Sequence, residues 1–254
     1  AGAVPPVIVV GIDTDDRINE YLYADILLDV GDEFILVEPR LDQYAQFLVD
    51  TVKPLVDLEF PTLPAREHTC MAGSSFGGIS SMYLAWKHPE VFGKVASFSG
   101  SYWVGEAFGT ETDLAMRDII ASTELTAEHM LLTVYLDSGG SDGANGDPNA
   151  YRDDARVYTD WTRNTLISLG WSNRPEWDTD DVLATPPENL PVTTHPKDVP
   201  TLLWAAEPPP DYAGWQTYLR PEASLLHLVG LGQEHNEAAW EARFPAAVRY
   251  LFGN

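Results

Sequence analysis

The fold is decided by the stretch HTCMAGSSFGGISSMYLAW, residues 68–86. It opens with the apolar run Thr69–Ala72, and short continuous runs of this kind are typical of strands buried on both faces of a parallel sheet. It closes with Ile79–Trp86, where apolar side chains recur at helix spacing. Between them stands Gly73-Ser74-Ser75-Phe76-Gly77, a G-x-S-x-G pattern. We therefore predict a strand, a sharp turn and a helix in immediate succession.

The sharp turn predicts a nucleophilic serine at Ser75. Such a turn strains the serine backbone, and small residues at Gly73 and Gly77 let the strand and the helix approach each other closely. The Ser75 hydroxyl then projects above the sheet at the start of the helix, where the backbone N–H of Phe76 can face a developing oxyanion. A glycine-rich turn without chemistry is the alternative, and the strand and helix on either side disfavour it.

The rest of the chain continues the alternation of strand and helix. Apolar runs that end in turn residues predict further strands at Val7–Val10, Val95–Phe98, Leu131–Leu136 and Leu225–Val229. Helix-spaced apolar side chains occupy residues 44–55 and 240–251. This order predicts one α/β domain over residues 1–254, with a mostly parallel sheet and helices on both faces. Active sites of such folds lie outside the carboxyl ends of the strands.

A proline-rich stretch, residues 171–223, interrupts this alternation. It contains Trp171, Trp177, Trp204 and Trp215. A long loop inside a compact domain usually serves as a lid or a binding loop, and the aromatic content favours an ordered, cap-like insertion. The alternative is a surface excursion that packs on the body without touching substrate.

A serine hydroxyl needs a base, and the acid and the histidine of such sites usually follow the serine along the chain. Of the six histidines, only His235 lies in the loop between the last strand and the terminal helix, where it could reach back to Ser75. We expect the acid in the loop after the strand Leu131–Leu136. Asp142 lies deep in this loop and is favoured over Asp137, which stands at the strand end and could be a capping residue. The carboxylate would hold the imidazole in the tautomer that accepts the serine proton.

Composition restricts the class of partner. With 39 Asp and Glu against 15 Lys and Arg, the formal net charge is −24, which repels nucleic acid and anionic membrane surfaces. No apolar run approaches the ~18–20 residues of a membrane-spanning helix. We therefore expect a globular protein that binds a small-molecule ester, with no nucleic acid and no membrane as partner. The acidic surface fits salt adaptation and a simple solubility effect equally.

The sequence predicts neither a metal nor an organic cofactor, because the histidines are scattered and no H-E-x-x-H motif is present. Cys70 is the single cysteine, which excludes an intramolecular disulfide, and its position in a strand predicts a structural thiol. No secretory signal opens the chain, which favours the cytoplasm but leaves the compartment open.

Several segments together resemble one known family. They are VIVVGID (residues 7–13) with Arg17-x-x-Glu20-Tyr21, AGSSFGG (72–78), HPEVFG (88–93) leading to SGSYW (99–103), YLDSG (135–139) and HNEAAW (235–240). The set is similar to the esterase family of the α/β-hydrolase superfamily that includes enterochelin esterases, S-formylglutathione hydrolase (esterase D), and feruloyl and acetylxylan esterases. The resemblance implies the α/β-hydrolase fold. It also implies a nucleophile at Ser75, a histidine at His235 and an acid at Asp142, counted from Gly139.

Family members normally have further strands upstream, ending in a loop that donates the second oxyanion-hole N–H. This chain begins after that region, so the resemblance implies a fold that lacks the usual first strands. We expect either that the oxyanion hole is rebuilt or that a partner segment or a second copy of the chain, in a homo-oligomer, completes the fold.

The leading hypothesis is a serine carboxylesterase that hydrolyses small carboxylic esters through an acyl-enzyme. Arg17 and Trp103 are candidate substrate-binding residues, and the aromatic side chains favour aryl or sugar esters, with short acyl esters also open. A strongly anionic siderophore fits the net charge less well unless Arg17 lies in the site. The alternatives are an acyltransferase and a non-catalytic or partner-dependent binding module.

Overall fold

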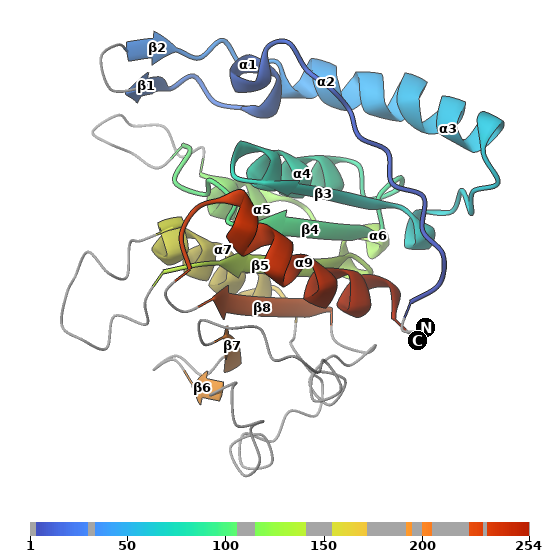
Figure 1. The fold of residues 1–254 in the computed structure, drawn as a ribbon. Coiled ribbons are helices and arrows are strands. Elements are labelled where there is room, and N and C mark those ends of the chain that lie inside the picture. Colours follow the sequence, from blue (N-terminus) through green and yellow to red (C-terminus); the bar gives the residue numbers. More distant parts are fainter. Residues whose placement is uncertain are drawn as a thin grey trace.

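The computed structural model describes residues 4–29, 34–105, 115–140, 154–171, 192–194, 200–204, 224–230 and 233–253. The body of this part is a six-stranded sheet in the order β3-β4-β5-β8-β7-β6 (Figure 1). Its strands are β3 (Cys70–Ser74), β4 (Lys94–Phe98), β5 (Thr133–Ser138), β6 (Val192–Thr194), β7 (Pro200–Trp204) and β8 (Leu225–Gly230). Every neighbouring pair is parallel except β6 and β7, which confirms the predicted mostly parallel sheet.

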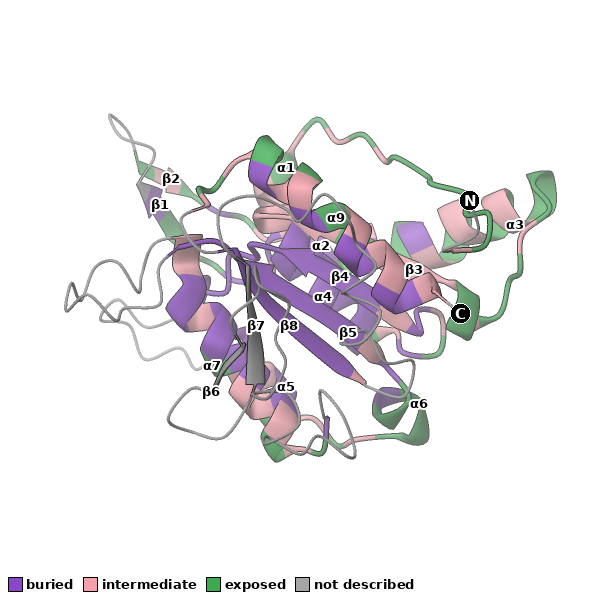
Figure 2. Cartoon of the chain, turned by 60° about the horizontal axis from the view of Figure 1, so that its bottom comes forward, coloured by how far each residue is buried: buried purple, intermediate pink, exposed green. Residues whose placement is uncertain are grey.

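Helices cover both faces of this sheet, as Figure 1 shows. The long ones are α4 (Phe76–Lys87) and α7 (Arg156–Ser168) on one face, and α9 (Glu237–Phe252) on the other. Along β4, Val95 packs in one core cluster with Met82 of α4, whereas Ala96 packs in a second cluster with Ala247 of α9. Successive strand side chains point to opposite faces, so the sheet is buried on both sides (Figure 2).

The carboxyl ends of the central strands are tied together by backbone hydrogen bonds. The N–H of Ser75, just after β3, donates to Phe98 O at 2.9 Å, and the N–H of Ser99, just after β4, donates to Asp137 O at 3.1 Å. The N–H of Gly140, just after β5, donates to Gln233 O in the loop after β8 at 3.0 Å. The loops that follow these four strands therefore start from one edge of the sheet with fixed spacing.

The N-terminal part forms a separate layer at the top of Figure 1. Its elements are α1 (Arg17–Tyr21), a hairpin of β1 (Leu27–Asp29) and β2 (Phe34–Leu36), α2 (Leu41–Phe47), a π-helical turn (Leu48–Val52) and α3 (Lys53–Glu59). The helix expected over 44–55 is thus confirmed and extends further at both ends. Three short helices complete the described part: a 3-10 turn (Arg66–His68), α5 (Met116–Ser122) and α6 (Ala127–Met130).

The strand predicted at Val7–Val10 is wrong. In the structure these residues belong to no strand, and all four side chains are exposed, Val9 by 80%. An apolar run forms a buried strand only where a neighbouring strand accepts its backbone hydrogen bonds, and none of the described strands pairs with this one. The other predicted strands are confirmed within a few residues of their expected bounds.

The interpretation of 171–223 as an insertion needs correction at two points. Trp171 is 2% exposed, and its indole N–H donates to Leu132 O at 2.9 Å, so it belongs to the core. Strand β7 lies in this stretch and pairs in parallel with β8, Leu202 opposite Leu228, so it extends the sheet of the body. Most of the remaining stretch lies outside the described residues. Among the helices that the structure describes, none is both long and apolar enough for a bilayer crossing.

Candidate active site

The turn at Ser75 has the predicted strand–turn–helix context. It joins β3 to α4, and Ser75 itself is the N-cap residue of α4 with φ 59° and ψ −122°. A positive φ is uncommon for a residue with a side chain, and such strain is found at functional sites where the surrounding structure holds it. Ser75, at the carboxyl edge of the sheet, therefore has a backbone conformation that is neither that of a strand nor that of a right-handed helix.

The two glycines of the motif play different parts. A Cβ on Gly73 would collide with the carbonyl oxygen of Gly77, so only glycine fits at this position. A Cβ on Gly77 would meet nothing nearer than the Tyr21 ring, at 3.9 Å. The expectation that both glycines are needed for close approach is therefore correct for Gly73 and wrong for Gly77, whose backbone supplies the contact.

Phe76 is the first residue of α4. The first N–H groups of a helix have no acceptor within the helix, and the helix dipole places partial positive charge at this end. This position suits an N–H that faces an oxyanion beside Ser75, and the oxyanion role of Phe76 stays a prediction.

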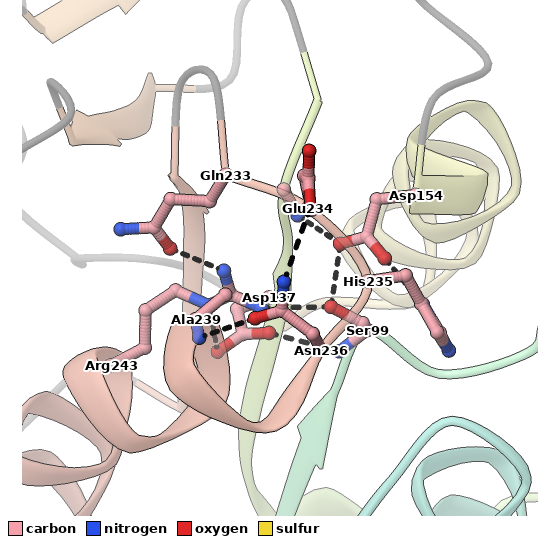
Figure 3. Close-up of polar contacts among 10 residues, drawn as sticks. Ser99, Asp137, Asp154, Gln233, Glu234, His235, Asn236, Ala239 and Arg243 are labelled. Carbon is pink, nitrogen blue, oxygen red and sulfur yellow. Dashed lines mark hydrogen bonds and ion pairs between the residues drawn. The ribbon is translucent and has the colours of Figure 1, made fainter.

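His235 stands directly before α9, whose N-cap residue Asn236 accepts a hydrogen bond from the Ala239 N–H at 3.0 Å. Its ring lies edge-on to Trp240, with 5.1 Å between the ring centroids and an interplanar angle of 89°. Its side chain is 40% exposed, and its Nδ1 atom is hydrogen-bonded to Oδ1 of Asp154 (Figure 3). One ring nitrogen is therefore held by a carboxylate while the ring remains accessible.

Asp154 is the carboxylate that the sequence analysis missed. Its side chain is 1% exposed, and Oδ2 accepts hydrogen bonds from the Ser99 hydroxyl, at 2.5 Å, and from the Gly139 N–H. It precedes α7 with φ 54°, a conformation that aspartate tolerates better than most residues. The expected acid, Asp142, lies outside the described residues. Asp154 follows Gly139 by 15 positions, and no spacing rule in the sequence marks so distant a residue.

Asp137, the other candidate acid, has different partners. It is fully buried and forms an ion pair with Arg243, from Oδ2 to Nε at 2.9 Å. It also accepts hydrogen bonds from the Tyr135 hydroxyl at 2.7 Å and the Ser99 N–H at 2.9 Å. Burial raises the pKa of Asp137, and the charge of Arg243 opposes this shift. These contacts agree with the alternative interpretation, in which Asp137 is a capping residue that binds neighbouring backbone and side-chain groups.

The structure brings His235 to an acid but does not join it to Ser75. Within the described residues, which include both side chains, no hydrogen bond links the Ser75 hydroxyl to His235. The strand order places β4 and β5 between the strands that lead to them, and all these strands end at the same edge. Catalytic hydrogen bonds are often long before substrate binds, so this geometry is compatible with a serine–histidine pair.

The two candidate substrate-binding residues both lie against Phe76. The Arg17 guanidinium stands 5.5 Å from the centroid of the Phe76 ring and 5.9 Å from that of Tyr21. The Trp103 ring lies 5.9 Å from Phe76 at an angle of 55°. Arg17 is exposed and forms no ion pair with any residue that the structure describes. Arg17, without an ion-pair partner among the described residues, and the Trp103 ring thus both adjoin Phe76, the residue after the candidate nucleophile.

Residues 1–166 match the model of a protein family described as "Putative esterase". This match covers more than half of the chain. The chain belongs to this esterase family.

The described residues contain no group of three or more His, Cys, Asp or Glu side chains that could hold a metal ion.

The relatives and solved structures that follow are matched over less than two thirds of their own length. The Iron(III) enterobactin esterase of Escherichia coli (strain K12) is 32% identical over 140 residues, which are 54% of this chain and 30% of that enzyme. Among solved structures, an IroE-like serine hydrolase from Shewanella oneidensis is similar with a TM-score of 0.52 and 11% identity, over 98% of this chain and 61% of that one. The enterobactin esterase FES from Shigella flexneri gives 0.51 and 18% identity, over 94% of this chain and 41% of that one. These likenesses confirm the α/β-hydrolase fold.

Proposed function

We propose that this chain hydrolyses carboxylic esters as a serine esterase, with Ser75 as nucleophile, His235 as general base and Asp154 as the acid that orients it. The observation that carries this proposal is the hydrogen bond between Asp154 and His235 Nδ1 at the sheet edge where the strained Ser75 turn also lies. Membership of the esterase family and the name of the Escherichia coli relative support ester hydrolysis in general.

The reaction follows from the chemistry of these groups. Nε2 of His235 takes the hydroxyl proton as Ser75 Oγ bonds to the ester carbonyl carbon, and the Phe76 N–H stabilises the oxyanion. The bond from this carbon to the alcohol oxygen then breaks, and His235 gives its proton to the departing alcohol. His235 then removes a proton from a water molecule, which attacks the acyl-enzyme. The carboxylic acid product leaves as Ser75 recovers its proton from His235.

The test is labelling with a fluorophosphonate probe, read by intact mass, together with turnover of p-nitrophenyl acetate and butyrate. We expect one probe per wild-type chain, no labelling of Ser75→Ala, and turnover of that variant reduced by at least ~10³-fold. Full turnover by Ser75→Ala would overturn the assignment. A folded wild-type chain that never labels and never turns over ester would favour the non-catalytic module. Product analysis with added alcohol separates hydrolysis from acyl transfer.

For the substrate, the proposal is an ester of an aromatic acid that carries a negative or electron-rich polar group. Arg17 has no ion-pair partner among the residues that the structure describes, and beside Phe76 it offers a positive charge in a protein of net charge −24. Phe76 and Trp103 offer aromatic surface for the ring. The Shigella flexneri structure was obtained in the presence of 2,3-dihydroxy-N-benzoyl-serine, an aromatic ligand of this chemical kind.

This substrate class is tested by comparing p-nitrophenyl benzoate with its 4-carboxylate derivative. Arg17→Ala is expected to lower kcat/KM for the charged ester about threefold to tenfold, as loss of one partly exposed ion pair would, and to change the neutral ester less than about twofold. Arg40→Ala is the matched control, because it removes the same charge from an exposed arginine that pairs with Asp16. Equal losses for both esters, or for both variants, would contradict a specific role for Arg17.

A further inference from the structure

We infer that Ser99 and Arg243 are positioning residues, which hold Asp154 so that it directs the proton of His235 to Nδ1. This inference rests on the proposed function, because it gives the serine–histidine–aspartate site its support. It is carried by a continuous chain of contacts from Arg243 through Ser99 and Asp154 to His235 (Figure 3).

The chemistry of the groups decides which one donates and which one accepts in each of these hydrogen bonds. Nη2 of Arg243 lies 2.8 Å from Ser99 Oγ, and a guanidinium can only donate, so the serine oxygen accepts. The single hydroxyl proton of Ser99 is then free to point at Asp154 Oδ2, 2.5 Å away. Asp154 must offer an acceptor lone pair there, which is what an ionised carboxylate does.

The remaining contacts of Asp154 fix the tautomer of His235. Oδ2 also receives the Gly139 N–H, so two donors occupy this oxygen and Oδ1 is left to His235. An acceptor-only carboxylate oxygen requires a proton on Nδ1 of the ring. Nε2 of the neutral ring then carries none and can accept the proton of Ser75.

Both proposed positioning residues are themselves held firmly. Arg243 is fully buried, and its ion pair with Asp137 leaves one terminal nitrogen for Ser99 and one for Gln233 Oε1, at 2.5 Å. Gln233 belongs to the loop that carries His235, so the same guanidinium fastens the acid and the histidine loop. Ser99 has φ 44°, and its N–H is bound to Asp137. Strand β4 and helix α9 therefore fix the hydroxyl between two charged groups.

The test replaces Ser99 with alanine and with glycine. Both variants lack the hydroxyl, but glycine accepts a positive φ without strain, so Ser99→Gly is the variant more certain to fold. We expect kcat to fall roughly 10–100-fold in both, as is usual for partners that orient a catalytic group, with KM changed less than about twofold. Ser97→Ala is the matched control. It removes the hydroxyl of another buried serine, which lies in β4, accepts from the Tyr102 hydroxyl at 2.9 Å and forms no hydrogen bond with Asp154. Its kcat should stay within about threefold of wild type.

A double-variant cycle separates positioning from general support of the fold. If Ser99 acts through Asp154, then Ser99→Ala should change kcat less than about twofold once Asp154→Asn is present. Full activity in Ser99→Gly would overturn the inference, as would an undiminished effect of Ser99→Ala in the Asp154→Asn background. Probe labelling of Ser75 keeps the two proposals apart. A wild-type chain that labels, with Ser99 variants as fast as wild type, refutes only the positioning role, whereas a wild-type chain that neither labels nor turns over refutes the proposed function.

Discussion

Asp154 and His235 are hydrogen-bonded to each other although 81 positions separate them along the chain. The contact joins the residue before the N-cap of α7 to the residue before the N-cap of α9, at the edge where β5 and β8 end side by side. It gives the histidine a buried carboxylate partner.

Asp154→Asn is expected to lower kcat by up to ~10⁴-fold while leaving the fold intact, because an amide can present its N–H to Nδ1 and stabilise the wrong tautomer. Asp142→Asn is the matched control, an isosteric change of another aspartate that follows β5, and it should stay near wild type. Steady-state kinetics with p-nitrophenyl butyrate measures both. A collapse of turnover in Asp142→Asn alone would return the acid to the position that the family resemblance implies.

The two glycines of the Ser75 turn should differ in their tolerance of a methyl group. Gly73→Ala places a Cβ against the backbone of Gly77, which must shift, so we expect it to lower the free energy of unfolding by about 1–3 kcal/mol or more and to abolish probe labelling. Gly77→Ala meets only ordinary contact at 3.9 Å and adds helix propensity, so its stability should stay within about 1 kcal/mol of wild type.

Urea unfolding of the glycine variants, with Gly11→Ala as control, provides the measurement, since a Cβ on Gly11 meets nothing within 4 Å. Equal destabilisation by Gly73→Ala and Gly77→Ala would mean that the turn is not packed as described.

Removal of the Arg243 charge should destabilise the protein in a pH-dependent way. Arg243→Met leaves Asp137 buried without its counter-ion, which typically costs about 3–5 kcal/mol. Burial already raises the pKa of Asp137 above its ordinary value of 3.8, and the variant loses the opposing charge. A raised pKa means that the folded state binds the proton more tightly than the unfolded state does. The stability that Arg243→Met loses relative to wild type is therefore smallest below pH 3.8 and grows as the pH rises through the pKa of Asp137 in the folded state.

Urea unfolding of wild type and Arg243→Met at pH 4.5 and pH 7.5 tests this sign. The difference between their free energies of unfolding should be larger at pH 7.5. The double variant Asp137→Asn/Arg243→Met lacks the Asp137 carboxyl, so its difference from wild type in the free energy of unfolding should depend on pH much less than that of Arg243→Met. A difference between Arg243→Met and wild type that becomes larger at the lower pH would contradict this prediction.

Cys70 should be unreactive in the native protein. Burial raises the pKa of its thiol to about 12, so almost no thiolate is present at pH 8, and the thiolate is the form that alkylates. We expect iodoacetamide to modify Cys70 only after denaturation, as read by intact mass. Cys70→Ala should keep esterase turnover within about twofold. Rapid alkylation at pH 8 together with loss of turnover would contradict a purely structural thiol.

Much of the candidate site could be predicted from the sequence because its signals are local. The apolar run before Gly73 and the helix spacing after it specify the Ser75 turn, since strand, turn and helix each depend on residues within a few positions. His235 could be found because it lies between a recognisable strand and a recognisable helix. The same reasoning failed at Val7–Val10, since an apolar run becomes a strand only when another strand lies beside it.

Only the tertiary structure decided which groups surround His235. Asp154, Ser99 and Arg243 come from three separate elements, and no periodicity or spacing in the sequence links them. Their meeting depends on the order β3-β4-β5-β8, which brings the ends of β4, β5 and β8 together with the residues just before α7 and the first two turns of α9. A loop carries no repeat that fixes how far along it an acid must stand. The partner of the histidine is therefore set by the lateral order of the strands and the packing of the helices on them.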